Sequence, residues 1–358
     1  MRRRFQAITP LTRHLEPRRR ITPVHYASRH DACRVQPVMV TQGSIGVDEF
    51  RLLAWEPAVP VHLRGFHSLP AMKTWFTDPN LEGEPVVFGD KLASSADAIV
   101  SYELLTSSSS RDDEYASASL RGFQAWLKGQ STGNKDGHLL LYALIDHLLA
   151  SVEGDQSRFL QFDAPLSLII QASRYNQSAD NSSSHRITQL YVAQSDIRSL
   201  PPALVEDLPV PELVRRAGKG DIYSSSIWLG LQPTYTPLHR DPNPNVFCQL
   251  AGSKAVRLLR PRAGLSVFQD VRRRLGILGS SSRLRGSDMM DGPEREELHR
   301  AVWVDDDSDS DNAPPEREIW QAVLDPGDAL FIPQGWWHSV SSVGREAELN
   351  ASANWWFR

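Results

Sequence analysis

The sequence predicts a mainly β domain with flanking helices, and three observations support this prediction. The chain has 358 residues, of which 41% are hydrophobic and 23% are charged, so it can bury a large core. Its C-terminal part contains many short β-favouring runs separated by turn residues, a pattern typical of an antiparallel sandwich or barrel. The longest uninterrupted apolar run, at 139–145, has seven residues and is too short to span a bilayer. We therefore expect a globular domain with no membrane partner.

The first 47 residues differ in composition from the rest of the chain. Residues 1–35 contain nine arginines against two acidic residues, Glu16 and Asp31, so this segment carries +7 while the whole chain carries −4. An Arg-rich opening without lysine is typical of an organellar transit peptide, or of a basic tail that contacts nucleic acid. We expect a basic, disordered segment over 1–47 and one folded domain over 48–358. The protein is expected to be intracellular: mitochondrial if the segment is a transit peptide, and otherwise cytoplasmic or nuclear.

Short helices and strands alternate in the N-terminal half of the domain. Hydrophobic spacing and Pro, Gly and Ser breaks predict helices at 50–53, 69–76, 139–149 and 201–216, and strands at 59–63, 85–88, 166–171 and 187–193. Polar loops are expected at 107–114 and 176–184, where Ser, Asn and Asp dominate.

After Gly220 short strands predominate. They share β-favouring residues bounded by turn signals, and we predict them at 226–231, 237–241, 246–250, 255–259, 329–332, 338–342 and 351–357. One long interruption, at about 276–315, is rich in Ser, Gly and acidic residues, and five of the seven residues 305–311 are aspartate. We expect this insertion to be a solvated, mobile acidic loop.

The strand predicted at 237–241 carries the clearest chemical signal. Residues i and i+2 of a strand point to the same side, so His239 and Asp241 converge while Arg240 faces away. Pro242 keeps Asp241 in an extended conformation, which favours that geometry. An imidazole and a carboxylate on one side are two of the three ligands of a facial metal triad.

A third ligand is expected from a neighbouring strand. The segment 324–333 reads as a tight turn, a buried strand and a break, and His338 begins the next strand directly after a Gly-Trp-Trp turn. Two histidines and one aspartate would bind iron(II) on one face and leave three positions open. Those positions allow a chelating cosubstrate and dioxygen, which a closed tetrahedral zinc site would not.

At these positions the chain resembles the small JmjC-type, cupin-like dioxygenases that use iron(II) and 2-oxoglutarate. The resemblance rests on the His-Arg-Asp motif at 239–241, on the Pro-Gly-Asp to His segment at 326–338 and on Asn-Trp-Trp-Phe at 354–357, and it extends from about 48 to 358. It implies a double-stranded β-helix (jelly-roll, cupin-like) core. It also implies an iron(II) ion held by His239, Asp241 and His338, with 2-oxoglutarate as cosubstrate and O2 as oxidant.

The same resemblance implies which residues hold the cosubstrate. The family places a threonine three residues before the first histidine, an asparagine six residues after it and a lysine fifteen residues after it; Thr236, Asn245 and Lys254 stand at these positions. A Leu-Tyr-x-x-Gln strand would supply the hydroxyl of Tyr191, and Asn354 matches an asparagine near the metal on the last strand. An anionic group held by a buried cation and two hydroxyls is chemically reasonable, because charge-assisted bonds offset the desolvation of both partners.

The expected activity is hydroxylation of a side chain in a protein or peptide substrate. Two other activities would use the same site: lysine demethylation, and hydroxylation of a tRNA base, for which RNA would be the partner. A cupin-like binding protein with a dormant metal site is the non-enzymatic alternative. The sequence carries no motif that identifies the substrate or the oligomeric state.

Overall fold

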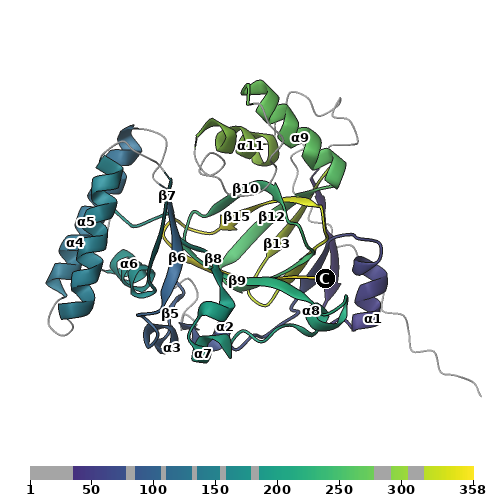
Figure 1. The fold of residues 1–358 in the computed structure, drawn as a ribbon, viewed down its shortest axis with the longest axis horizontal. Coiled ribbons are helices and arrows are strands. Elements are labelled where there is room, and N and C mark those ends of the chain that lie inside the picture. Colours follow the sequence, from purple (N-terminus) through teal and green to yellow (C-terminus); the bar gives the residue numbers. More distant parts are fainter. Residues whose placement is uncertain are drawn as a thin grey trace, which may run out of the picture.

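The computed structural model describes residues 35–77, 85–105, 110–130, 135–153, 159–178, 185–277, 292–304 and 318–358. Within these ranges two β-sheets pack face to face, and helices cover their outer faces (Figure 1). The arrangement confirms the predicted mainly β fold with a jelly-roll core and flanking helices. The Arg-rich segment up to residue 34 and the aspartate run at 305–311 lie outside the described residues.

The smaller sheet has five strands and carries both predicted metal-ligating histidines. Its strands, in spatial order, are β1 (Val35–Pro37), β13 (Ile319–Leu324), β12 (Ser253–Leu259), β15 (Trp337–Val343) and β10 (Tyr235–Arg240). β10 is an edge strand that pairs with β15 in antiparallel fashion, and His239 lies opposite His338 in this ladder. The register of the two strands therefore brings both histidines to one place.

The larger sheet has nine strands. In spatial order they are β2 (Met39–Gln42), β3 (Val61–Arg64), β14 (Ala329–Ile332), β11 (Asn245–Ala251), β16 (Leu349–Phe357), β9 (Ile222–Leu231), β8 (Leu190–Asp196), β6 (Ile99–Leu105) and β7 (Phe159–Pro165). A separate ladder pairs β4 (Phe76–Thr77) with β5 (Val87–Phe88). The strand predictions after Gly220 are all confirmed within a few residues, because that part of the sequence alternates β-favouring runs with turns.

Helices pack on the outside of both sheets. They are α1 (Val47–Phe50), followed by a π-helical segment (Arg51–Trp55), α2 (Ala71–Thr74), α3 (Asp90–Ala93), α4 (Ser110–Gly129), α5 (Lys135–Glu153), α6 (Ser167–Gln177), a 3-10 turn (Ile197–Ser199), α7 (Pro202–Val205), α8 (Glu212–Arg216), α9 (Pro261–Arg274) and α11 (Pro293–Trp303). In Figure 1, α4 and α5 form a hairpin beyond β7, and α9 and α11 lie over β10 and β15. Among the described residues, no helix is both long and apolar enough to cross a bilayer.

Four hydrophobic clusters lie among the described residues, and the three larger ones stabilise this arrangement. The largest packs the N-terminal helices against the outer face of the larger sheet and includes Trp75, Phe123 and Trp355. A second lies under α9 and α11, and a third fills part of the space between the two sheets, around Phe247 and Trp336. Because apolar side chains fill only part of that space, polar side chains can gather in the remainder, which is where the candidate site lies.

Several local predictions are wrong. The segment 166–171 is not a strand but the beginning of α6, because its short apolar run continues at helical spacing through Ala172 and Tyr175. A polar loop was expected at 107–114, yet α4 begins at Ser110; a Ser-rich stretch followed by acidic residues is also a signal for a helix start. Residues 107–109 lie outside the described part.

The boundaries of the folded region also differ from the expectation. β1 and β2 lie before residue 48 and pair with β13 and β3, so the described fold begins at Val35. The acidic insertion at 276–315 contains a helix, α11, over Pro293–Trp303. Tertiary packing stabilises this helix, since Leu298 and Val302 are buried against the smaller sheet.

A buried hydrogen-bonded cluster joins the turn before β14 to β3. One carboxylate oxygen of Asp328 lies 2.8 Å from His62 Nε2, and the other accepts the Gly65 N–H at 2.8 Å. The Asp328 carbonyl oxygen lies 3.1 Å from His67 Nε2. Gly327 has a φ of 94°, a conformation that other residues rarely adopt, which explains the Pro-Gly-Asp motif at this turn.

We predict that acid weakens the fold partly through this cluster. Burial lowers the pKa of His67 from 6.5 to about 4, and burial also lowers the pKa of His62 although its hydrogen bond to Asp328 acts in the opposite direction. Between pH 6.5 and about 4 the unfolded chain thus binds protons that the folded chain excludes, so the free energy of unfolding falls as the pH falls. His67→Gln should reduce this pH dependence in urea unfolding, and the same change at exposed His147 should not. The role assigned to His67 would be contradicted if the free energy of unfolding depended equally on pH in the wild type and in both variants.

Candidate metal centre

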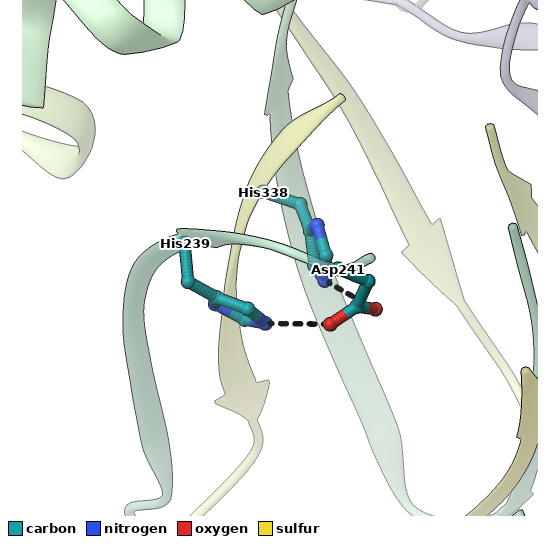
Figure 2. A group of neighbouring side chains, drawn as sticks. All are labelled: His239, Asp241 and His338. Atoms are coloured by element: carbon teal, nitrogen blue, oxygen red, sulfur yellow. Dashed lines mark ion pairs between the residues drawn. The ribbon is translucent and has the colours of Figure 1, made fainter. Parts of the chain in front are cut away.

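Two histidines and one aspartate meet beside the pair formed by β10 and β15 (Figure 2). Asp241 Oδ1 lies 3.9 Å from His239 Nε2, and Asp241 Oδ2 lies 3.5 Å from His338 Nε2. All three side chains are buried, and one ligand atom from each lies within 4.8 Å of the others. The structure therefore brings together the three residues that the sequence selected.

A bulge in β10 creates this geometry. Thr236 pairs with Val340 and His239 pairs with His338, so β10 has one more residue than β15 between these two pairs. Pro237 has no amide hydrogen to contribute to the ladder, and proline in a sheet is confined to such irregular or edge positions. The bulge places the two imidazole rings with their centroids 4.1 Å apart.

Backbone carbonyl groups orient both imidazole rings. His239 Nδ1 lies 2.8 Å from the Pro237 carbonyl oxygen, and His338 Nδ1 lies 3.4 Å from that of Trp336. When Nδ1–H donates to a carbonyl, the lone pair is on Nε2, which is the atom that faces Asp241 in both rings. Two neutral imidazoles and one carboxylate on one side suit a divalent transition metal such as iron(II), so the donor set fits a facial metal site.

Side chains from the larger sheet hold the aspartate in place. Trp356 Nε1–H and Asn245 Nδ2–H donate to Asp241 Oδ2 at 2.7 and 3.2 Å. Asn354 in turn donates to Asn245 Oδ1 at 3.1 Å and accepts the Trp228 Nε1–H at 2.7 Å. With Oδ2 engaged by these donors, Oδ1 is the carboxylate oxygen available to a metal.

The structure places Asn245 beside Asp241 and Asn354 behind Asn245, so these two amides orient the Asp241 carboxylate. The sequence did not predict that Trp356 donates a hydrogen bond to Asp241 or that Trp228 donates one to Asn354. A signal was present for Trp356: Asn354 and Trp356 are two residues apart on β16, so they point to the same side of the sheet. Both are buried, as this shared inward direction requires.

Lys254 is buried in the same pocket, with 1% of its surface exposed. Its Nζ donates to Ser352 Oγ at 2.8 Å and to the Tyr191 hydroxyl at 3.3 Å, and no carboxylate pairs with it among the described residues. Burial lowers the pKa of Lys254 from 10.5 to about 7. The rings of Tyr191 and Phe247 also lie near Nζ, with their centroids 5.5 and 5.3 Å away. A buried amine with hydroxyl and aromatic partners but no carboxylate provides a binding point for an anion, which would favour its charged form.

One pocket contains all of these groups. Residues from both sheets line it, and they include every site residue predicted from the sequence: Tyr191, Thr236, His239, Asp241, Asn245, Lys254, His338 and Asn354. Five further side chains complete the lining: Gln194, Trp228, Phe247, Val340 and Trp356. The side chains of His239, Asp241 and His338 thus face the same space as Lys254, while the role of each residue in binding stays a prediction.

An open groove meets this pocket at Gln194, which lines both. The groove runs over β6, β7, β8 and β9, and its lining includes the carboxylates of Glu103, Asp163 and Asp196. No lysine or arginine is among the described residues that line it, although Arg198 pairs with Asp196 at 2.9 Å. Gln194 has a φ of 52° and lies where the ladder between β8 and β9 shifts register, so a bulge forms the junction.

The fold and the site define a jelly-roll domain with a His, Asp and His cluster between strands. The chain belongs to the cupin-like domain family, whose model matches residues 56–358.

Three curated relatives illustrate the similarity. Jumonji C domain-containing protein 5 of Drosophila melanogaster is 29% identical over 168 residues, which cover 46% of this chain and 36% of the relative. Lysine-specific demethylase 8 of Danio rerio is 30% identical over 169 residues, covering 47% of this chain and 36% of the relative. JmjC domain-containing protein F of Dictyostelium discoideum is 27% identical over 201 residues, covering 53% and 39%. The chain therefore matches less than half the length of each relative.

We predict that Trp356→Phe weakens metal binding while the protein stays folded. The change removes the N–H that donates to Asp241 but keeps an aromatic ring in the core. Loss of such an outer hydrogen bond typically lowers metal affinity about 10- to 100-fold. Isothermal titration with Mn(II) would measure this effect, with Trp355→Phe as the matched control because Trp355 is the neighbouring residue and packs in the outer core. Equal affinities in the two variants would contradict the role of Trp356.

Proposed function

We propose that the protein is an iron(II)- and 2-oxoglutarate-dependent dioxygenase that hydroxylates a side chain of a protein substrate. The observation that carries this proposal is the single pocket that joins the His239, Asp241 and His338 cluster to a buried lysine without a carboxylate partner among the described residues. A metal site alone would fit many proteins. A metal site and an anion anchor facing one small pocket fit a metal-chelating dicarboxylate such as 2-oxoglutarate.

Each part of the pocket has a distinct task in this proposal. The two Nε2 atoms and Asp241 Oδ1 hold iron(II), while Lys254 binds the distal carboxylate of 2-oxoglutarate with the hydroxyls of Tyr191 and Thr236 beside it. When bound, the metal and cosubstrate supply the oxidising chemistry, which activates dioxygen for attack on a C–H bond. The protein supplies binding, orientation and exclusion of water, since every one of these side chains is buried.

The groove beside the pocket supports a protein substrate over a tRNA. Its carboxylates, from Glu103, Asp163 and Asp196, would repel the phosphates of a nucleic acid, whose binding depends on Lys and Arg contacts. The groove is open and reaches the pocket at Gln194, so an extended peptide can lie along it and direct one side chain inward.

Lysine demethylation is the second candidate, favoured by the names of relatives such as lysine-specific demethylase 8 of Danio rerio. The reaction uses the same hydroxylation step: a hydroxylated N-methyl group is lost as formaldehyde. Formaldehyde release from methyl-lysine peptides would identify a demethylase, whereas a substrate that gains one oxygen atom without formaldehyde release would identify a hydroxylase.

The proposal predicts that the purified protein converts 2-oxoglutarate and dioxygen to succinate and CO2 when iron(II) is present, with ascorbate as the two-electron reductant that consumes the second oxygen atom when no substrate is bound. His239→Ala should reduce this turnover to background, because one of the three metal ligands is removed. His147→Ala, the same change at an exposed position on α5, should leave it unchanged. Turnover by His239→Ala at the wild-type rate would refute the proposal.

A second prediction concerns the opposite effects of Lys254 on stability and binding. Lys254→Met replaces a buried ammonium group with an apolar chain of similar size, so the ligand-free protein should unfold at a higher temperature. The same variant should bind 2-oxoglutarate about 10- to 100-fold more weakly in the presence of Mn(II), because a charge-assisted bond is lost. Differential scanning calorimetry and isothermal titration would measure the two effects. Unchanged affinity would show that Lys254 is not the carboxylate anchor.

A further inference from the structure

The strand that carries the metal ligands lies at an open edge of its sheet. β10 is the last strand in the order of the smaller sheet and pairs only with β15. An edge strand has unpaired N–H and C=O groups along one side and is held less firmly than a central strand. Because His239 lies in β10 and Asp241 follows it directly, the metal site requires this edge to be held in place.

α11 packs against this edge strand. This helix belongs to the segment between β12 and β13, and Figure 1 shows it above β10. Its Leu298 and Val302 pack in one cluster with Leu238 of β10. The ring of His299 meets the ring of Tyr235 edge to face, with the centroids 5.0 Å apart. These contacts place α11 against the outer face of the smaller sheet, over β10.

Two arginines outside α11 fix the helix to the rest of the domain. Arg272 of α9 pairs with Glu294 at 3.1 Å, and the Glu294 side chain is 4% exposed. Arg257 of β12 donates to the Val302 carbonyl oxygen at 2.6 Å and lies over the ring of Trp303, 4.9 Å from its centroid. α11 is therefore anchored to β12 and α9, and it can transmit that rigidity to β10.

A hydrogen-bond relay leads from α11 into the bulge of β10. Trp303 Nε1–H donates to Ser339 Oγ at 2.8 Å, and the Ser339 hydroxyl donates to the Thr236 carbonyl oxygen at 2.8 Å. Ser339 is fully buried on β15, opposite the extra residue of the bulge. Its hydroxyl reaches a backbone group that the shifted register leaves beside the bulge, one residue before Pro237.

We propose that α11 is a positioning element of the metal site and that it acts through Trp303 and Ser339. The inference rests on the proposed function of the pocket. Neither residue lines the pocket, so both act by holding the bulge of β10. The bulge sets how far His239 and Asp241 lie from His338. It also sets how far Thr236 lies from Lys254. Without the relay, β10 can relax toward a regular edge strand. His239 and Asp241 would then move relative to His338, and Thr236 would move relative to Lys254.

The test compares variants that remove the relay with matched controls on the same sheet. Ser339→Ala removes the hydroxyl, and Trp303→Phe removes the indole N–H while keeping the ring. Ser341→Ala, on the same strand, and Trp320→Phe, on β13 two strands away, make the same chemical changes elsewhere. Ser339→Thr retains the hydroxyl. Mn(II) affinity is measured by isothermal titration, at a temperature where circular dichroism shows every variant to be folded.

We expect Ser339→Ala and Trp303→Phe to bind Mn(II) about tenfold more weakly, the lower end of the effect of outer hydrogen bonds on metal affinity. Ser339→Thr and both controls should bind as the wild type does. Wild-type affinity in both relay variants, or equal losses in the controls, would overturn the inference while leaving the proposed function intact. A wild-type protein that binds no Mn(II) would instead refute the proposed function, and the inference with it.

Discussion

The hydrogen bonds that Asp241 accepts from Trp356 and Asn245 connect the two sheets at the point where the site lies. Asp241 follows an edge strand of the smaller sheet, whereas its two donors lie on β16 and β11 of the larger one. A buried carboxylate without such donors would be strongly destabilised. These bonds therefore orient Asp241 from the opposite sheet, while the register of β10 with β15 brings the two histidines to the same place.

Burial of Lys254 in the pocket lowers the stability of the fold. Lys254 lies deep between the sheets, and burial lowers its pKa to about 7. An apolar residue would pack there without losing hydration, so the buried amine lowers the stability of the ligand-free fold. In the proposed function, binding of an anion would offset this cost. The remaining space between the sheets is filled by apolar side chains such as Val256 and Leu330, which shows that the fold itself does not require a polar interior.

Short-range patterns predicted seven of the eight described strands after Gly220 but missed β13. The residues proposed for the site all line one pocket of the structure. Strand periodicity places His239 and Asp241 on one side, and the turn before a neighbouring strand points to His338. Lys254 was selected by the resemblance to the JmjC-type family. The contacts that were not predicted depend on pairing between distant strands. The position of Trp356 beside Asp241 follows from the register that sets Asn245 opposite it on β11, and one sequence does not contain that register.

Local patterns were also ambiguous for two helices. The apolar run that begins α6 fits a buried strand as well as a helix, since a run of four to eight residues shows no period by itself. α11 lies within an acidic, Ser-rich insertion whose composition indicates a loop. Its helical form depends on burial of Leu298 and Val302 against the smaller sheet, which only the folded chain provides.

In the proposed function, one pocket binds both a metal and a chelating 2-oxoacid. An anaerobic titration of the protein with iron(II), followed by 2-oxoglutarate, tests it most directly through the visible metal-to-ligand charge-transfer absorption. We expect a band that appears only when both are present and that is absent from His338→Ala. Iron-loaded wild-type protein that stays colourless at saturating 2-oxoglutarate would contradict the account.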